Sequence, residues 1–342
     1  MITLEKFGIY EDKELLLFTV KNANGAFIQL TNYGATIVSV VVPGRNGELE
    51  HVIAGFDEPD DYLHDKCYMG STIGRFANRI GNAAFELDGK QYYLEANDNT
   101  NSNHGGNSGY NLRAFDYKIE DDKLIFTLSS QDGDGGFPGN LGLIVSYQWT
   151  ENNQLKITYL AETDQPTIAN FTNHAYFNLS GKRGSMLDHR LTIYADQTLE
   201  TNKEYIPTGK VIQADKMAFR GDRIDDKVKE GNGEGFNHYY ILNNQDDNNR
   251  LAAVLDDENS GRRLNVYTTY PGLMFYTGDF LESIHPGHLG KLYKPFDGLC
   301  LECQYYPDAP NHSIFPSTVL KPGEQYKEEI IYEFTLIPDI QI

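Results

Sequence analysis

Strand-length runs separated by short turn signals are the feature that most constrains how this chain can fold. In "FELDGKQYYL" the dipeptide Asp88-Gly89 stands between two strand-like halves, and this is the strongest short-range signal of a β-hairpin. Similar reversals are expected at Pro43-Gly44 with Asn46-Gly47, at Asn152-Asn153 and near Ser260-Gly261. The 23 Tyr and 18 Phe residues suit pleated surfaces that pack aromatic rings.

Helical patterns are few and short. The candidates are the segment "DEPDDYLHD" near residue 60 and the segment around Met217–Asp226. No long linker and no repeat of fixed period interrupts the chain. We therefore predict an all-β fold, a large antiparallel β-sandwich with few short helices, in which residues 1–342 form a single domain with its function on a concave face.

The composition excludes several classes of protein. The 342 residues include 40% hydrophobic and 12% aromatic residues, which is ample for a globular core. No apolar run approaches the roughly 18 residues of a membrane span, and the N-terminus lacks a charged segment followed by an apolar one. Cys67, Cys300 and Cys303 do not make a disulfide framework. We expect a soluble, cytoplasmic protein that does not enter a membrane.

The net charge of −20 argues against binding to nucleic acid, which needs clustered Lys and Arg side chains to neutralise phosphates. It argues more weakly against heavily phosphorylated small substrates. An acidic, solvated surface that keeps the protein in solution accounts for the charge.

The run "NFTNHAYFNL", Asn170–Leu179, alternates like a half-buried strand. On one face it would place Thr172, His174 and Tyr176, a hydrogen-bonding row suited to a polyhydroxylated ligand. Asn173 is a polar residue on the apolar side, where it is expected to bond to backbone. From the alternation alone, a solvent-facing strand with an incidental histidine is an equally good interpretation.

A second alternating run, "GLCLECQYY", places Cys300, Glu302 and Gln304 on one face of a strand. Cys303 then faces the opposite way from Cys300, so the two cysteines are not a C-x-x-C redox pair and are interpreted as structural. A carboxyl group in partly apolar surroundings has a raised pKa and can serve as a general base. Glu302 is therefore a candidate base, although it could simply pair with an arginine.

Two polar stretches complete the candidates. "IGRFANRIG" offers Asn78 and Arg79 at a glycine-flanked bend, and in "NTNSNHGGNSGYN" His104 precedes Gly105-Gly106. Arginine is a natural clamp for oxygen ligands. A metal site is not expected, because His285 and His288 lie in a Pro-Gly turn without convergent acidic or cysteine partners.

Together these stretches resemble the galactose mutarotase (aldose 1-epimerase) family nearly end to end. The resemblance is carried by "GRFANRI", "NHGG", "DGGFPGN", "TNHAYFNL", "IPTG", "TTYPGLMFYTGDF", "LECQ" and "LKPGEQY". It implies a galactose mutarotase-like supersandwich, a large antiparallel β-sandwich with a sugar site on an open face. It also implies an isomerase that interconverts the α- and β-anomers of free aldohexoses such as galactose and glucose, within hexose metabolism.

Carried over position by position, the resemblance makes His174 the acid and Glu302 the base of a reversible ring opening. The residues implied to contact the sugar are Asn78, Arg79, His104, Tyr176 and Asn237, whereas Arg75 is assigned to structure only. A matched acid and base suffice for this reaction, so no cofactor and no metal is implied. The expected partner is a small sugar, and the chain is expected to be a monomer or a homodimer.

The chain departs from the family pattern at two positions. Asn237 stands where members usually have an Asp, and Met274 stands where some members have a Gln. An amide keeps the hydrogen-bonding shape of a carboxylate but loses its charge, so we expect weaker or redirected recognition of one ring hydroxyl. Galactose, glucose, a pentose and maltose all remain open as the preferred sugar.

Three other functions compete with this one. A glycoside hydrolase would need a second carboxylate beside Glu302. A hexose-6-phosphate epimerase would show additional basic residues around the site. A non-catalytic sugar-binding module would explain the Tyr, Asn and Arg residues but not the pairing of His174 with Glu302.

Overall fold

The computed structural model describes residues 2–244 and 249–338. Over these ranges the chain is dominated by strands, which form three large sheets with antiparallel neighbours. In order across the first sheet, the nine strands are β11 (Asp116–Glu120), β12 (Lys123–Ser130), β13 (Leu141–Trp149), β14 (Gln154–Thr163), β28 (Tyr326–Leu336), β24 (Arg262–Thr268), β23 (Arg250–Asp257), β18 (Arg190–Ile193) and β21 (Arg220–Arg223).

The other sheets are smaller. The six-stranded sheet runs β17 (Tyr176–Phe177), β26 (Leu299–Gln304), β25 (Gly272–Tyr276), β22 (Asn237–Ile241), β19 (Gln197–Thr201) and β20 (Pro207–Gln213). The five-stranded sheet runs β1 (Ile2–Tyr10), β2 (Lys13–Lys21), β3 (Phe27–Thr31), β4 (Thr36–Pro43) and β5 (Leu49–His51). Short pairs are formed by β6 (Thr72–Ile73) with β16 (Thr172–Asn173), β7 (Arg79–Ile80) with β10 (Ser102–Asn103), β8 (Ala84–Leu87) with β9 (Lys90–Tyr93), and β15 (Thr167–Ile168) with β27 (Val319–Leu320).

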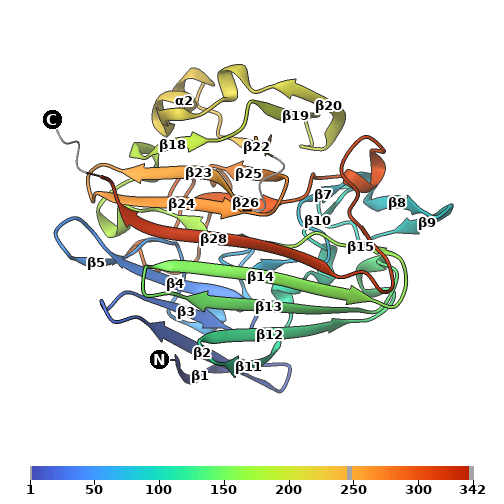
Figure 1. Cartoon of the computed structure of the whole chain (residues 1–342), viewed down its shortest axis with the longest axis horizontal. Coiled ribbons are helices and arrows are strands. Elements are labelled where there is room, and N and C mark those ends of the chain that lie inside the picture. Colours follow the sequence, from blue (N-terminus) through green and yellow to red (C-terminus); the bar gives the residue numbers. More distant parts are fainter. Residues whose placement is uncertain (1, 245–248, 339–342) are drawn as a thin grey trace.

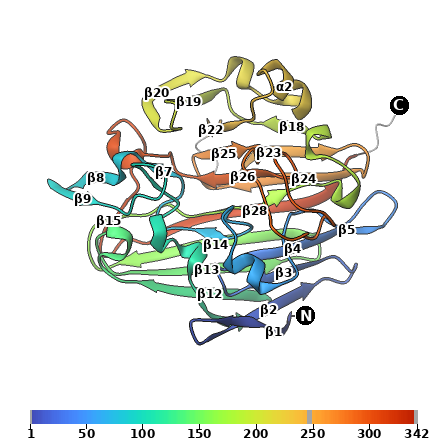
Figure 2. The same ribbon diagram turned by 180° about the vertical axis from the view of Figure 1, so that it is seen from behind.

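The nine-stranded sheet forms one layer, and the five- and six-stranded sheets lie against it (Figures 1 and 2). The largest core cluster fills the space between the layers, since it joins Phe126 of the nine-stranded sheet, Leu30 of the five-stranded sheet and Leu273 of the six-stranded sheet. The prediction of a large antiparallel β-sandwich is confirmed.

The predicted reversals lie where the turn signals placed them. Asp88-Gly89 joins β8 to β9 with Leu87 opposite Lys90, and Asn152-Asn153 lies between β13 and β14. Pro43 ends β4, and the residues from Gly44 to Gly47 lie between β4 and β5, whereas Gly261 lies between β23 and β24. Both residues of the Asp88-Gly89 turn have positive φ, as a two-residue hairpin of this kind requires.

Two α-helices occur in the described ranges, α1 (Pro59–Leu63) and α2 (Ile224–Glu230). The first confirms the prediction near residue 60. The second shows that the bounds predicted around Met217–Asp226 are wrong, because Arg220–Arg223 pairs with β18 as an edge strand and the helix begins only afterwards. Neither helix is long and apolar enough to cross a bilayer.

The prediction that Asn170–Leu179 is one half-exposed strand is also wrong. The run contains two two-residue strands, β16 and β17, with His174 and Ala175 between them, and all ten residues are buried. The reason is that the run passes from one pairing partner to another, since β16 pairs with β6 and β17 pairs with β26.

The polar side chains of this run bond to backbone. Thr172, which alternation directed towards a ligand, donates its hydroxyl to the Cys303 carbonyl. Asn170 and Asn178 donate to the carbonyls of Tyr305 and Asp297, and Asn173 donates to that of Gly70. The expectation that Asn173 bonds to backbone agrees with these contacts, and Asn170 and Asn178 secure the chain in the same way.

Candidate active site

One cavity of about 150 Å³ brings together every residue that the resemblance placed in a site. These residues are Asn78, Arg79, His104, His174, Tyr176, Asn237 and Glu302. They come from five separate parts of the chain and lie at β7, beside β10, at β17, on β22 and on β26. The cavity faces away from the nine-stranded sheet, because Leu299, Leu301 and Cys303 of β26 occupy the side that packs on the main core.

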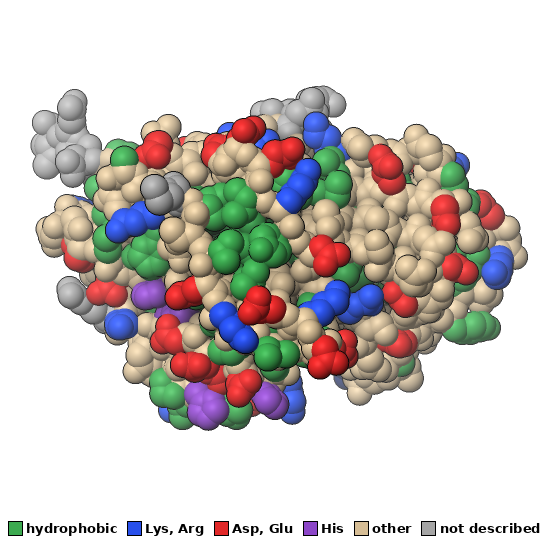
Figure 3. Space-filling view, turned by 90° about the horizontal axis from the view of Figure 1, so that it is seen from below, with side chains coloured by type: hydrophobic (Ala, Val, Ile, Leu, Met, Phe, Trp, Pro, Cys, Tyr) green, Lys and Arg blue, Asp and Glu red, His purple; other side chains and the backbone are tan. Residues whose placement is uncertain are grey.

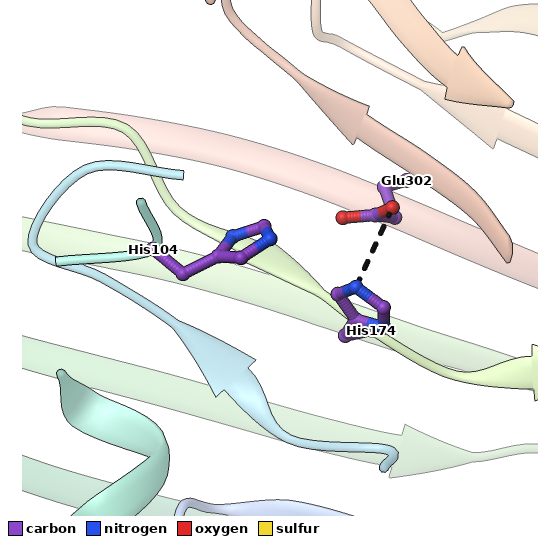
Figure 4. Close-up of side chains that lie close together, drawn as sticks. All are labelled: His104, His174 and Glu302. Atoms are coloured by element: carbon purple, nitrogen blue, oxygen red, sulfur yellow. Dashed lines mark ion pairs between the residues drawn. The ribbon is translucent and has the colours of Figure 1, made fainter. Parts of the chain in front are cut away.

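His174 and Glu302 are the central pair of the cavity. Nε2 of His174 lies 3.8 Å from Oε1 of Glu302, and Figure 4 shows the imidazole and the carboxyl group pointing towards each other. Both side chains are almost fully buried, and within the described residues Oε2 of Glu302 has no hydrogen-bond partner. The gap is longer than a hydrogen bond, so each group retains hydrogen-bonding capacity for a bound ligand.

Burial shifts the pKa of each partner towards its neutral form. Removal from water raises the pKa of Glu302 to about 8, and the nearby Arg79 opposes this shift. The same cause lowers the pKa of His174 to about 4, against a hydrogen bond to its own backbone carbonyl. The imidazole is surrounded by the rings of Tyr68, Tyr176 and Tyr276 at centroid distances of 5.7, 5.1 and 6.4 Å.

His104 is held in one orientation by the backbone of the neighbouring strand. The amide N–H of Asn78 donates to Nδ1 of His104 at 3.2 Å, and the amide of His104 donates back to the Asn78 carbonyl. Because Nδ1 accepts, the hydrogen of the neutral imidazole lies on Nε2. Burial, followed by the charges of His174 and Arg79, holds the pKa of His104 well below its usual range. His104 is therefore a neutral ring with an Nε2–H donor.

Arg79 is oriented by contacts on the outer side of the cavity. Its Nε donates to Oδ2 of Asp98 at 2.7 Å, and its guanidinium lies 5.3 Å from the ring centroid of Tyr205. In the described part of the chain the two terminal nitrogens have no hydrogen-bond partner. They remain free to donate to an oxygen ligand.

Tyr176 and Asn237 line the cavity in different ways. The Tyr176 hydroxyl donates to the carbonyl of Cys67, so its oxygen is left as an acceptor. Asn237 lies at the start of β22 and is half-buried. Met274, the second departure from the family pattern, lies directly opposite Glu302 in the β25–β26 register and is buried.

Sequence reasoning missed six lining residues: Lys66, Cys67, Tyr68, Asn103, Tyr276 and Phe280. Lys66 to Tyr68 follow α1 in an irregular segment that carries no periodic signal, so the sequence gives no reason to select them. Tyr276 ends β25 in "GLMFYTG" and Asn103 directly precedes His104. Tyr276 and Asn103 could therefore have been selected from the sequence, because each lies within or next to a motif that carries the resemblance.

Arg75, His285 and His288, which the sequence analysis did not assign to a ligand site, lie outside this cavity. Arg75 is buried and donates to the carbonyls of Pro138 and Gly139 and to the Ser130 hydroxyl, as its structural assignment implies. His285 pairs with Asp61, and His288 pairs with Asp57.

Three of the lining groups could in principle hold a metal ion. Ligand atoms of His104, His174 and Glu302 lie within 4.8 Å of one another, which sequence reasoning did not foresee. The hydrogen bond from Asn78 decides against His104, because a ring that accepts at Nδ1 carries its hydrogen on Nε2 and cannot coordinate through that atom. The trio is better suited to hydrogen bonding with a polar organic ligand.

Comparisons with a family model and with known proteins all lead to the aldose 1-epimerase family. Residues 16–333 match the family model described as aldose 1-epimerase. The chain is 36% identical over 338 residues to the galactose mutarotase of Bos taurus, covering 98% of this chain and 95% of that protein. It is 36% identical over 331 residues to the aldose 1-epimerase of Escherichia coli K12, covering 93% and 94%.

The fold is shared with a solved structure as well. The aldose epimerase homologue from C. elegans superposes with a TM-score of 0.88 at 29% identity, covering 94% of this chain and 99% of that chain.

Proposed function

The chain belongs to the aldose 1-epimerase family, and from that membership we propose that it interconverts the α- and β-anomers of free aldohexoses such as galactose and glucose. The observation that supports this most directly is the buried pair of His174 and Glu302, separated by 3.8 Å in a cavity lined with hydrogen-bonding side chains. Isomerases of this family open and reclose a cyclic hemiacetal, for which one acid and one base suffice.

In the proposed mechanism Glu302 takes the proton of the C1 hydroxyl while His174 gives a proton from Nε2 to the ring oxygen. The ring opens to an aldehyde, the C1–C2 bond rotates, and the ring closes on the other carbonyl face. Both proton transfers then reverse, so the enzyme returns to its starting state. Arg79 and the Nε2–H of His104 donate to sugar oxygens, while Tyr176 and Asn237 complete the hydrogen bonds.

The shifted pKa values fit this cycle. After ring opening Glu302 carries the transferred proton and His174 is neutral. Burial favours this same state, since it raises the pKa of Glu302 and lowers that of His174. The cavity therefore stabilises the pair at the stage at which the sugar is open, and recognition of the closed sugar must offset the charge separation that precedes it.

The competing functions fit the cavity less well. Glu302 is the sole carboxylate among the lining residues that the structure describes, whereas a glycoside hydrolase uses two about 5–10 Å apart. Lys66 and Arg79 are the only basic lining residues in those ranges, and Arg79 is already paired with Asp98, which is little for a sugar phosphate. A passive sugar-binding module does not require the His174–Glu302 pair.

Polarimetry of freshly dissolved α-galactose and α-glucose tests the proposal. The parent protein should accelerate the approach to anomeric equilibrium, and Glu302→Gln and His174→Asn should each lose about 100-fold or more of kcat. Glu324→Gln, on the surface, is the matched control and should keep the parent rate.

A parent protein that leaves the rate of mutarotation unchanged would refute the function. Sugar binding by calorimetry without turnover in any variant would instead favour a binding module. The cytoplasmic location, the role in hexose metabolism and the choice between monomer and homodimer remain predictions.

A further inference from the structure

The proposed acid, His174, has a second close neighbour, Cys300, to which the proposed mechanism gives no role. Sγ of Cys300 lies 3.5 Å from Nδ1 of His174, and neither side chain is open to solvent. His174 lies two residues before Tyr176, the first residue of β17, and the register of the sheet places Tyr176 opposite Cys300 on β26. The contact joins residues 126 positions apart in the chain.

Strand β26 contacts both nitrogens of the imidazole. Cys300 and Glu302 are two residues apart on the same face of this strand, about 6.6–6.8 Å along its axis. Cys300 meets Nδ1 and Glu302 faces Nε2, so one strand determines the surroundings of both ring nitrogens. A single extended segment thus fixes the ring between a sulfur and a carboxyl group.

The chemistry of the reaction requires the two nitrogens to behave differently. If Nε2 gives a proton to the ring oxygen and later takes it back, Nδ1 must keep its hydrogen throughout the cycle. Inside a buried site that hydrogen needs acceptors, because an unpaired N–H there is costly, and Sγ of Cys300 lies beside Nδ1 in addition to the backbone of His174 itself. Burial keeps the Cys300 thiol neutral by raising its pKa well above the usual range. A neutral sulfur accepts weakly and adds no charge beside the ring.

From this geometry we propose that Cys300 is a positioning residue: its sulfur accepts a hydrogen bond from Nδ1–H of His174 and leaves Nε2 as the nitrogen that exchanges a proton with the sugar. The inference deepens the proposed function and rests on it. His104 provides the contrast within the same cavity, because the N–H of Asn78 directs its hydrogen to Nε2. The two histidines are thus held in opposite tautomers, one as a shuttle and one as a fixed donor.

Cys303 provides a matched control for the packing role that buried cysteines usually have. It lies on the same strand, is equally buried, and packs into the main core on the face opposite Cys300. Truncation to alanine at either position removes the same sulfur atom from a buried site. Loss of packing alone would therefore affect the two variants alike.

The experiment compares Cys300→Ala, Cys300→Ser and Cys303→Ala by polarimetry. Cys300→Ala should lose about tenfold or more of kcat with KM nearly unchanged, whereas Cys300→Ser should recover most of the rate because a hydroxyl oxygen also accepts. Cys303→Ala should keep the parent kcat. Equal losses in Cys300→Ala and Cys303→Ala would overturn the proposal.

Nitrogen NMR of isotope-labelled histidine reads the tautomer directly and requires no turnover. His174 of the parent protein should carry its hydrogen on Nδ1, and in Cys300→Ala this preference should weaken. A parent His174 with its hydrogen on Nε2 would overturn the proposal, even if Cys300→Ala failed to fold. If the parent protein failed to turn over any aldose, the proposed function would fall while the tautomer remained measurable.

Discussion

Burial, more than any single charged neighbour, determines the chemistry of the residues in this cavity. It is the largest cause of the pKa shifts of His104, His174 and Glu302, and it favours the neutral form of each. A carboxyl group and an imidazole with these shifts share a single proton over the neutral pH range. A reversible ring opening needs that one proton and an empty site to receive it.

The first prediction concerns the pH dependence of kcat/KM. Below about pH 4 both His174 and Glu302 carry a proton, so Glu302 cannot act as the base. Above about pH 8 neither group carries one, so His174 cannot act as the acid. We expect a bell-shaped profile with limbs near these values, which belong to the pair as a whole. Polarimetry from pH 3.5 to 9 checks it, and a flat profile up to pH 9 would contradict it.

The second prediction concerns Asn237, the amide that replaces the usual Asp of the family pattern. Asn237→Asp should raise kcat/KM for galactose about fivefold, because a charged acceptor strengthens a hydrogen bond by about 1 kcal/mol. The gain should differ between galactose and glucose if this side chain forms a hydrogen bond with one ring hydroxyl. Asn103→Asp, which adds the same charge elsewhere on the cavity wall, is the control. Unchanged values for both sugars in Asn237→Asp would refute the idea.

At the scale of elements, the loop after β10 holds His104 through close backbone contacts. His104 has φ 54°, and Gly105 has φ +90° with its Cα so near the Gly74 carbonyl that an added Cβ would lie 2.1 Å from the oxygen. Gly74 belongs to the segment that leads to Asn78, which orients the His104 ring. The loop and this segment therefore position the donor together.

The third prediction follows from this contact. Gly105→Ala should destabilise the fold by about 2 kcal/mol or more and raise KM, because the loop must move and take His104 with it. Gly133→Ala is the matched control, since Gly133 has φ +88° but open space where a Cβ would lie, and it should cost about 1 kcal/mol with KM unchanged. Urea unfolding and sugar-dependent rates measure both effects. Equal losses in the two variants would show that backbone strain, not the close contact, matters.

At the scale of the molecule, the position of the segments that line the cavity depends on buried hydrogen bonds that anchor them to the sandwich. Arg75 precedes the site segment in the chain and donates to groups around the turn between β12 and β13.

On the face in Figure 3 acidic and basic side chains are interspersed around a gathering of hydrophobic ones, without the basic cluster that nucleic acid would need.

The fourth prediction concerns the buried hydrogen bonds that Arg75 donates. Arg75→Met should lower the free energy of unfolding by about 3 kcal/mol or more, because it leaves buried carbonyls and a hydroxyl without donors. Arg190→Met removes an exposed arginine that pairs with Glu258 and should cost less than about 1 kcal/mol. Denaturant titration compares them, and similar losses would contradict the structural role.

The amino-acid sequence by itself determined the hairpins and the face of β26, because turn chemistry and alternation are local properties of the chain. Asp88-Gly89 and the shared side of Cys300 and Glu302 could be predicted for this reason. The seven site residues came from motif resemblance, and the structure brings them together in one cavity.

The tertiary structure alone decided the partners of each functional group. The break at His174 arises because β16 and β17 pair with different strands, and period-two alternation cannot reveal such a change of partner. The contact of Cys300 with Nδ1 of His174 and that of Asn78 with His104 join residues distant in the chain. Burial and hydrogen bonding of this kind depend on packing between segments, and the order of residues within any one segment does not encode them.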